Sequence, residues 1–371
     1  MKAIFDCKLT KDNLKKLAAI TTSDTVNIVV KDNVARLISS GNDRVIEIEV
    51  PVTAEGTVKF TVNQKMFSGI MEGRSSVTIE TTDGDNNIVF HGTKKGSSYK
   101  GSIVLLPYNK IKIKTLEEGL IFKKEHHTAL MEALPQVRLT DVYSNGIMYI
   151  FIKGTSKKLI VSCFDNSHVI YHTNKSVRFK RDINFSFPVQ ILEIIGSLAQ
   201  GNPYSIAVDD SLILVKGKDF MANFPSMQTV SETDLNEVIK YILALPKKSE
   251  SHITISIDKL KKFITNAASM YEANESLLLK AADDNKVALS IETSVGKLQE
   301  TIKAEGKWKE DAHCNPLLLV DLIGSVPVKE IEINNFKGQA MYFRVTGAKT
   351  KTTYSCSFIQ ETAKPKKKKH E

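Results

Sequence analysis

The sequence predicts an α+β protein of three similar domains, each made of two units in which a strand leads into a helix and then into further strands. Two observations predict this fold class. Apolar residues at positions i, i+3 and i+4, which share one face of a helix, recur along the chain. Runs of alternating apolar and polar residues, typical of half-buried strands, flank these positions. Because one helical stripe and a few strands cannot bury a core alone, we expect two units to pack together, with helices on one face of an antiparallel sheet.

The apolar helical triplets form two interleaved series. Members of one series lie roughly 125 residues apart, and each follows a member of the other series by about 55 to 60 residues. The triplets are Leu14/Leu17/Ala18, Phe67/Ile70/Met71, Leu130/Ala133/Leu134, Ile191/Ile194/Ile195, Leu260/Phe263/Ile264 and Leu319/Leu322/Ile323. The alternative is a generic α+β chain whose stripes agree by chance, since any single stripe is typical of an ordinary core. The order of the six triplets favours a repeat, and a repeat of this kind indicates a ring-forming scaffold rather than an enzyme.

Strands are predicted on both sides of these helices. The runs that lead into the first, third and fifth helices are Ala3–Cys7, Leu120–Phe122 and Ile253–Ile257, and the runs that follow them are Val26–Val30, Met148–Ile152 and Val287–Ile291. Asp32-Asn33 and Asp284-Asn285 stand at matching points of the first and third domains, where Asn and Asp tolerate the left-handed conformation that tight hairpins require.

The pattern breaks at two junctions, which give the predicted domain boundaries. We assign the first domain to residues 1–110, the second to 116–228, a linker to 229–250, the third to 251–360 and a disordered basic tail to 361–371. Lys110 to Lys114 alternates Lys with Ile and is predicted to be an extended edge segment. Leu235, Val238, Ile239 and Ile242 predict a helix between Ser231 and Leu245, which Pro246 ends.

Composition and motifs argue against a membrane protein, a secreted protein and an enzyme. The chain has 42% hydrophobic residues, enough for packed cores, but no run of 18 apolar residues and no secretory signal pattern. Its cysteines (Cys7, Cys163, Cys314 and Cys356) include no CxxC pair and are expected to be reduced and buried. No phosphate-binding loop, dinucleotide fingerprint, nucleophile elbow or HExxH motif occurs. We therefore expect no catalytic residue, cofactor or metal.

One pair of adjacent histidines and two pairs of adjacent aspartates do not indicate a metal or catalytic site. His126 and His127 are adjacent, so on a helix they point about 100° apart and cannot hold one metal ion together. We expect them at the surface or at an interface. Asp209-Asp210 and Asp283-Asp284 are predicted to lie in hairpin turns, where Asp is favoured for backbone reasons.

The net charge of +9 predicts an acidic partner. Lysines lie opposite the apolar stripe on three predicted helices: Lys11, Lys15 and Lys16 on the first, Lys65 with nearby Arg74 on the second, and Lys259, Lys261 and Lys262 on the fifth. The fourth and sixth helices carry Glu193 and Asp321 instead. For any single lysine, a solvated surface position is the simpler explanation. Agreement among three helices favours a surface that faces phosphates.

The repeat and three local segments resemble the DNA polymerase sliding clamp of the bacterial beta type, over about residues 1 to 360. Met221–Pro225 is similar to the Phe-Pro segment of the family that leads into the third domain. Phe164–Val169 is similar to its Thr-Asp-Gly-His-Arg-Leu stretch, with the Asp kept and the His shifted. The helix from Ile257 to Ala268 lies where the family opens its third domain. The likeness is of architecture more than of identity, as in a divergent, phage-encoded clamp.

This resemblance implies three DNA-clamp domains per chain and a head-to-tail homodimer that closes a six-domain ring, with helices inside and sheets outside. It implies double-stranded DNA in the hole, held without base readout, and a DNA polymerase and a clamp loader as partners in the cytoplasm of a bacterial or phage-infected cell. The pocket where the family binds its partners would correspond to Val169, Phe224, Pro225, Phe358 and Ile359. The longer linker, the basic tail and the basic net charge depart from the family.

Two other interpretations stay open. One is a monomeric processivity factor that holds a polymerase on DNA by electrostatic contact without forming a ring. The other is an enzyme with a site near Asp165 and His168 in an interdomain groove, which the missing nucleotide, metal and nucleophile motifs disfavour.

Overall fold

The computed structural model describes residues 1–357 except residues 82–85, 95–96, 116–118, 144–148, 165–167, 210, 227–236, 238, 241–243, 245–248, 269–275, 284, 295, 325–327 and 337–339. The chain divides into two compact units, Met1–Thr128 with Gln190–Met227, and Ala129–Val189 with Gln228–Glu371. The predicted middle domain, residues 116–228, therefore contributes to both units.

The first unit contains the elements of the N-terminal third of the chain together with a later segment. These elements are β1 (Lys2–Asp6), α1 (Cys7–Thr21), β2 (Thr25–Lys31), β3 (Val34–Gly41), β4 (Arg44–Glu55), β5 (Val58–Asn63), α2 (Gln64–Ile70), β6 (Ser76–Glu80), β7 (Asn87–Lys94), β8 (Ser97–Val104), β9 (Leu120–Phe122), α4 (Val189–Ala199), β14 (Tyr204–Val208), β15 (Leu212–Gly217) and β16 (Phe220–Pro225). Helix α3 (Lys124–Tyr143) begins in this unit and continues into the second.

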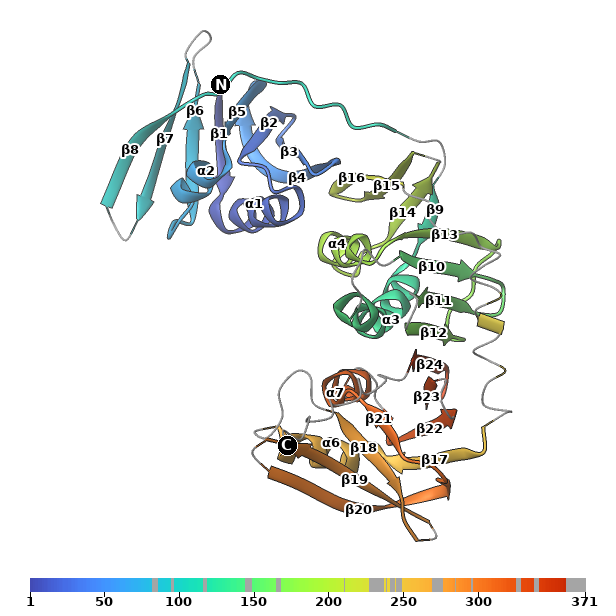
Figure 1. Ribbon diagram of the computed structural model, residues 1–371. Coiled ribbons are helices and arrows are strands. Elements are labelled where there is room, and N and C mark those ends of the chain that lie inside the picture. The colour runs from blue at the N-terminus through green and yellow to red at the C-terminus, as the bar shows by residue number, and fades with distance from the viewer. Residues whose placement is uncertain are drawn as a thin grey trace, which may run out of the picture. The chain divides into compact units, whose positions relative to one another are not determined.

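The second unit holds the remaining elements. They are β10 (Tyr149–Gly154), β11 (Leu159–Phe164), β12 (His168–Asn174), β13 (Ile183–Pro188), β17 (Ser251–Ser256), α6 (Ile257–Ala267), β18 (Leu277–Ala281), β19 (Lys286–Thr293), β20 (Gly296–Lys307), β21 (Ala312–Cys314), α7 (Pro316–Gly324), β22 (Glu330–Phe336), β23 (Ala340–Thr346) and β24 (Thr350–Ser357). Figure 1 shows these helices and strands along the chain.

The same order of elements occurs six times, which confirms the predicted α+β repeat. Each half-repeat is one strand, one helix and three strands, as in β1–α1–β2–β3–β4 and β5–α2–β6–β7–β8. The pairing between halves is reciprocal, because the first strand of each half joins the three later strands of the other half. Thus β1 pairs with β6 and β5 pairs with β2, and the same exchange joins β9 to β14, β13 to β10, β17 to β22 and β21 to β18. Neither half can complete its own sheet.

Local sequence explains where the helices begin. Asp6 ends β1 and caps α1, with a carboxylate oxygen that accepts the Leu9 N–H at 2.7 Å, and Asn63 caps α2 in the same way at Met66. Cys7, which was predicted as a strand residue, is instead the first residue of α1. Ile257 ended a predicted strand and began the predicted helix, and it is the first residue of α6. The correction follows from the capping residues Asp6 and Ser256, which stand where each strand turns into its helix.

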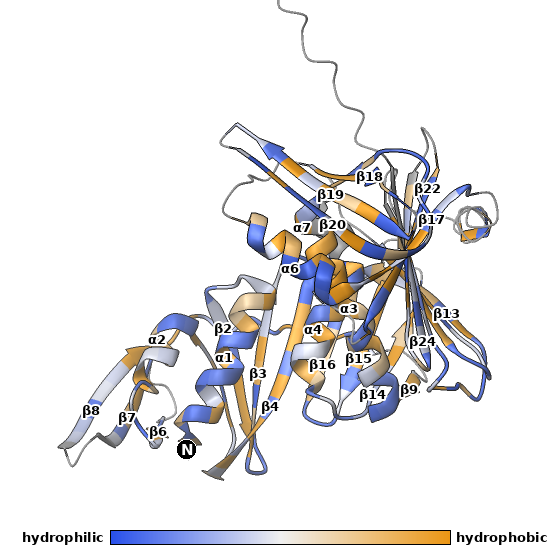
Figure 2. Cartoon of the chain, turned by 90° about the horizontal axis from the view of Figure 1, so that it is seen from below, coloured by the Kyte–Doolittle hydropathy of each residue, from blue (hydrophilic) through white to orange (hydrophobic). Residues whose placement is uncertain are grey.

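The helical stripes form the cores, as predicted, with small differences. Leu260, Phe263 and Ile264 of α6 are fully buried, and the triplets of α4 and α7 are buried as well. Two residues of the triplets, Ile70 and Leu134, are only half-buried. In α1 the expected Ala18 is exposed, because the helix packs through Leu14, Leu17 and Ile20 instead. In Figure 2 hydrophobic and hydrophilic residues alternate along β19 and β20, as expected for strands with one buried and one exposed face.

Strand pairing continues beyond the predicted domain boundaries and gives each unit one twelve-stranded sheet. In the first unit β4 pairs with β16, with Ile48 opposite Phe220 and Val45 opposite Asn223. In the second unit β12 pairs with β24 from His168↔Cys356 to Asn174↔Thr350. The backbone hydrogen bonds of these two ladders, which involve no particular side chain, join residues more than 150 positions apart.

A buried polar cluster fixes the junction of β12 and β24. His172 lies opposite Thr352 and is only 2% exposed. Its Nδ1 is 3.0 Å from Oε1 of Gln136 in α3 and 2.9 Å from the Thr352 hydroxyl, which donates to the same Gln136 oxygen at 2.7 Å. Because that oxygen only accepts, Nδ1 carries the ring proton. Nε2 is buried and has no hydrogen-bond partner among the described residues.

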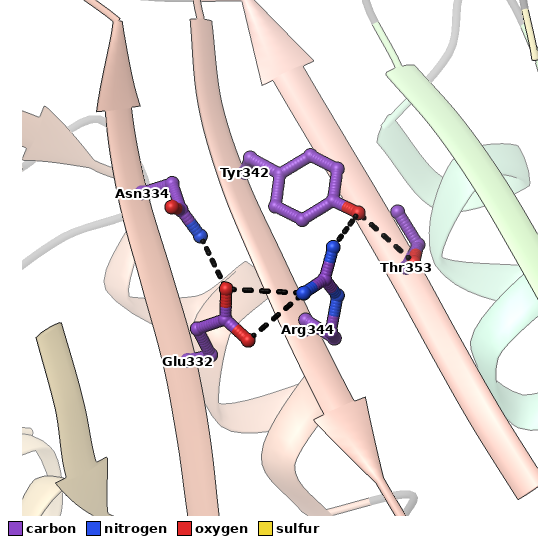
Figure 3. Close-up of polar contacts among 5 residues, drawn as sticks. All are labelled: Glu332, Asn334, Tyr342, Arg344 and Thr353. Carbon is purple, nitrogen blue, oxygen red and sulfur yellow. Dashed lines mark hydrogen bonds and ion pairs between the residues drawn. The ribbon is translucent and has the colours of Figure 1, made fainter. Parts of the chain in front are cut away.

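A second polar network lies on the adjacent strands β22, β23 and β24 (Figure 3). The Arg344 guanidinium donates to both carboxylate oxygens of Glu332, at 3.2 and 3.1 Å, and to the Tyr342 hydroxyl at 3.0 Å. The Tyr342 hydroxyl lies 3.3 Å from that of Thr353, and Asn334 donates to Glu332 at 3.1 Å. Ile331, Ile333 and Phe343, the intervening residues of these strands, belong to the apolar core, so the network occupies the opposite face of the sheet.

The segment 107–115, which we call the strap, corrects part of one prediction. Lys110 to Lys114 was expected to be an extended edge segment, and it is extended, but residues 107–115 form no strand, and only the preceding Leu106 makes a bridge, to Thr61 of β5. Buried asparagines hold the strap instead. Asn27 of β2 donates to the Asn109 carbonyl, and Asn223 of β16 donates to the Lys114 carbonyl at 3.1 Å. Figure 1 shows the strap as an extended trace that passes β5 and β2 on its way to β9.

The remaining predictions concern two turns, the cysteines, the linker helix and the tail. Asp32 and Asn33 have φ values of 51° and 62°, which confirms the left-handed turn between β2 and β3. Asn285 has a φ of 60°, whereas Asp284 lies outside the described residues. Cys7, Cys163 and Cys314 are buried thiols, as expected. Of the predicted linker helix only Glu237, Ile239, Lys240 and Ala244 are described, each as helical, and the tail 361–371 lies outside the described residues.

The buried His172 predicts a pH-dependent stability. Burial lowers its pKa from 6.5 to about 4. The unfolded chain gains this proton below about pH 6.5, whereas the native protein resists it until about pH 4, so stability is full above pH 6.5 and falls as the pH drops from 6.5 to 4. We expect His172→Gln to flatten the melting temperature over this range, measured by calorimetry. The exposed His252→Gln serves as the control, and an unchanged slope in His172→Gln would contradict the prediction.

Candidate nucleic-acid interface

The structure brings Lys15 of α1 and Lys65 of α2 to one groove. This groove has a volume of about 440 Å³, and the lysines share its lining with two carboxylates and with uncharged residues: Asp24, Glu72, Leu14, Ala18, Ser23, Gln64, Ser68 and Gly69. Both lysines are exposed. Two half-repeats thus place predicted phosphate contacts on the same helical surface, although the residues are 50 positions apart in the sequence.

Lys11 is already paired. Its ammonium forms an ion pair with Glu72, which follows α2, and the Lys11 side chain is only 22% exposed. Lys11 therefore meets a carboxylate in this structure, and any phosphate would compete with Glu72 for it. Because the Glu72 side chain is 63% exposed, water reaches this pair, which contributes about 1 kcal/mol or less to stability, so such competition is feasible.

Arg74 has a structural role that the sequence did not suggest. Its Nη1 donates to the Ile70 carbonyl and lies 3.4 Å from the carbonyls of Gly69 and Glu72, where α2 ends. Its Cζ lies 3.8 Å from the centre of the Tyr99 ring in β8. The guanidinium thus caps the C-terminal carbonyls of α2 and stacks on an aromatic ring, which leaves it less available to DNA than a free lysine.

The remaining predicted lysines lie elsewhere on α1 and on α6. Lys16 lines a larger groove of about 840 Å³ that α1 forms with the end of α4 and the turn between β15 and β16. Lys259, Lys261 and Lys262 are all exposed on α6 in the second unit. Sequence reasoning missed Lys8, which is exposed in the first turn of α1. Recognising Asp6 as the N-cap would have placed Lys8 on the helix.

The residues of the predicted partner pocket fall in different parts of the chain. Val169 lies in β12 of the second unit and is buried at 7% exposure. Phe224 is fully buried and Pro225 half-buried in β16 of the first unit. Phe358 and Ile359 lie outside the described residues. Phe224 is therefore a core residue, and the pocket stays a prediction.

The two adjacent histidines are buried, which corrects the expectation that they lie at a surface or interface. His126 and His127 are each 6% exposed. His126 Nδ1 accepts the Lys123 N–H at 3.0 Å, and the His127 ring packs edge-on against Tyr204, which itself stacks on Phe122. Burial lowers the pKa of His127. The start of α3 packs on aromatic residues of β9 and β14, and adjacent side chains on a helix can both be buried when two elements cover it.

Other candidate sites find no support among the described residues. The described residues contain no group of three His, Cys, Asp or Glu side chains able to hold a metal ion. Asp165 and the side chain of His168, where an enzyme site was considered, lie outside the described residues. No helix in the described part of the chain is long and apolar enough to cross a membrane.

Comparison with known proteins identifies the fold. No protein-family model matches the sequence, and no curated protein matches it. A putative DNA polymerase III beta subunit from Eubacterium rectale ATCC 33656 is 16% identical, with a TM-score of 0.78 over 97% of this chain and 100% of that chain. The chain has the sliding-clamp fold. DNA polymerase III subunit beta from Borrelia burgdorferi matches with a TM-score of 0.79 at 15% identity, over 97% of this chain and 98% of that chain.

The DNA polymerase sliding clamp from Bacillus subtilis gives a similar result, with 15% identity, a TM-score of 0.75 and coverage of 97% of this chain and 99% of that chain. The clamp fold thus extends over nearly the whole chain, as the resemblance in sequence implied. With so few identical residues, the likeness rests on the arrangement of the strands and helices rather than on shared side chains.

Arg74 gives a prediction that separates a structural role from a DNA contact. Arg74→Ala removes the cap of α2 and the stacking on Tyr99, and we expect it to lower the free energy of unfolding by about 1–2 kcal/mol. Lys65→Ala, at an exposed position of the same helix, should change it by less than about 0.5 kcal/mol. Urea denaturation of both variants measures the difference. Unchanged stability of Arg74→Ala with weakened DNA binding would instead assign Arg74 to DNA.

Proposed function

We propose that this protein is a sliding clamp, a processivity factor without chemistry of its own that encircles duplex DNA and tethers a replicative polymerase. The clamp fold over 97% of the chain is the observation that carries this proposal. The exposed lysines of α1, α2 and α6 support it, because sequence-independent attraction to phosphates suits a protein that slides. A polymerase and a clamp loader are the proposed protein partners, and the cytoplasm of a bacterial or phage-infected cell is the proposed location.

The strand pairings within the chain support a head-to-tail ring of two copies. In both observed junctions the last strand of a first half pairs with the last strand of a second half, β4 with β16 and β12 with β24. Among the described residues, β8 pairs only with β7, and residues 296–303 of β20 pair only with β19. These are the two remaining last strands. Pairing β20 of one copy with β8 of the next would repeat the observed junction and leave neither edge open.

The repeat also predicts the register of this pairing. Val52–Glu55 pair with β1 as Ala304–Lys307 pair with β17, so Val45–Ile48 of β4 correspond to Lys297–Glu300 of β20. The ladder β14–β15–β16 is equivalent to the ladder β6–β7–β8. Their registers match Phe220–Asn223 of β16 with Tyr99–Ser102 of β8. The same close packing of a glycine against an aromatic ring occurs in both ladders. A Cβ added to Gly92 would clash with Tyr99, and a Cβ added to Gly217 would clash with Phe220. We therefore expect Lys100 to lie opposite Gln299 of the neighbouring copy.

A disulfide tests the ring and its register together. Directly opposed residues of antiparallel strands have Cα atoms about 4.5–5.5 Å apart, within the range that a disulfide spans. We expect the double variant Lys100→Cys/Gln299→Cys to form a covalent dimer under mild oxidation and to retain closed circular duplex DNA at high salt. Lys100→Cys/Lys303→Cys, which shifts one cysteine by four residues or about 13 Å, is the matched control and should not cross-link.

The native mass decides between the ring and the monomeric processivity factor. Light scattering behind size exclusion should give a mass near twice 41.3 kDa. A monomer at every concentration, with no cross-link in the double variant, would remove the self-closing ring and favour the monomeric factor.

The lysine groove predicts a change in salt dependence. Each phosphate contact contributes about 0.9 to the slope of log K against log salt for duplex DNA. Lys15→Gln/Lys65→Gln should therefore lower the slope by about 2, whereas Glu72→Gln should raise the affinity because it frees Lys11. Fluorescence anisotropy with a labelled duplex measures both effects. An unchanged slope in the double variant would remove this groove from the DNA surface.

Several finer assignments belong to the same proposal. The three clamp domains are assigned to residues 1–110, 116–228 and 251–360, and partner proteins are expected near Val169, Pro225, Phe358 and Ile359. The fully buried Phe224 is expected to support that region only as a core residue.

A further inference from the structure

The strap between β8 and β9 carries an alternating pattern that the clamp function does not use. Lys110, Lys112 and Lys114 are exposed, while the intervening Ile111 and Ile113 are half-buried. In an extended chain alternate side chains point the same way and lie about 6.6 Å apart, so the three ammonium groups form a row about 13 Å long. Tyr108 precedes them in the same alternation and is 40% exposed.

The strap is held in place at both ends. Asn27 is 3% exposed, donates to the Asn109 carbonyl and accepts from the Thr61 hydroxyl at 2.7 Å. Asn223 is 4% exposed and donates to the Lys114 carbonyl at 3.1 Å. The two buried side-chain amides hold these backbone carbonyls by hydrogen bonds. The strap is therefore ordered, whereas the chain of a flexible linker would be free to move. The row of cations is therefore presented in a defined direction.

We propose that the strap binds single-stranded nucleic acid, with the three lysines along the phosphate backbone and Tyr108 stacked on a base. Proteins that bind single strands without sequence preference combine a cationic track with aromatic side chains on which bases stack. Lysine spacing alone would also suit an acidic peptide or a duplex. The exposed Tyr108 favours the single strand, because the bases of a duplex are stacked on each other and an acidic peptide has no base to stack.

Among the described residues, one carboxylate interacts with the charge of the strap. Lys114 is the last of the causes that lower the pKa of Asp209, after the hydrogen bonds from Ser211 and Leu212. Asp209 is exposed, so it weakens the attraction at one end of the row only. No ion pair of Lys110 or Lys112 is found among the described residues.

This binding activity goes beyond the proposed clamp function, because the strap lysines are distinct from those of α1, α2 and α6. The test uses the full chain and a fluorescein-labelled oligothymidine of about 20 nucleotides, a length that spans the site sizes of such proteins. Three strap variants are compared with wild type: Lys110→Gln/Lys112→Gln/Lys114→Gln, Tyr108→Ala and Tyr108→Phe. A helix variant, Lys259→Gln/Lys261→Gln/Lys262→Gln, carries the same charge change elsewhere.

We expect the triple strap variant to bind the oligonucleotide about tenfold more weakly and to lower the slope of log K against log salt by about 2, from about 0.7 per phosphate contact. Tyr108→Ala should lose at least about fivefold in affinity, whereas Tyr108→Phe, which keeps the ring, should bind like wild type. The helix variant should bind the oligonucleotide like wild type. Strap variants should keep their retention on closed circular duplex, so a failure of the ring and a failure of this proposal are distinguishable.

Three outcomes would overturn the proposal. The first is no binding of the oligonucleotide by wild type, and the second is equal loss in the strap and helix variants, which would indicate general charge attraction. The third is full competition by poly-glutamate with no effect of Tyr108→Ala, which would assign the strap to an acidic protein segment.

Discussion

The exchange of first strands between half-repeats is the constraint on which the rest of the structure depends. Because β1 completes the sheet of the second half and β5 completes that of the first, neither half can satisfy its backbone hydrogen bonds alone. The exchange fixes each helix as well, since the first strand runs directly into a helix through a capping residue such as Asp6 or Asn63. Each of the three pairs of half-repeats therefore has the same arrangement of strands and helices.

Backbone pairing also explains how the fold survives great divergence in sequence. The ladders of β4 with β16 and β12 with β24 are built from main-chain groups and accept any side chains that keep the alternation of buried and exposed positions. This is consistent with TM-scores of 0.75 to 0.79 at identities of 15 to 16%. Side chains add local contacts: the buried His172 cluster lies at the junction of β12 and β24, whereas the buried Asn223 of β16 holds the strap.

Basic residues serve different purposes on different elements. Arg74 caps a helix and Lys11 pairs with Glu72, so two residues of the predicted DNA surface already have partners in the protein. Lys15 and Lys65 share a groove, and the α6 lysines remain exposed. The strap lysines form a separate row that two buried asparagines orient. These basic residues thus serve structural contacts, the helical surface and the strap.

The sequence by itself determined the elements and their order. Helical stripes, alternating strands and turns such as Asp32-Asn33 depend on neighbouring residues, and periodicity reveals them. It also located the exposed α6 lysines, because a position opposite an apolar stripe is exposed. Only the tertiary structure decided the strand exchange, the burial of His126 and His127, the stacking of Arg74 on Tyr99 and the anchoring of the strap by Asn27 and Asn223. Each of these depends on contacts between residues distant in the chain, and no local pattern encodes which distant partner will satisfy a polar group.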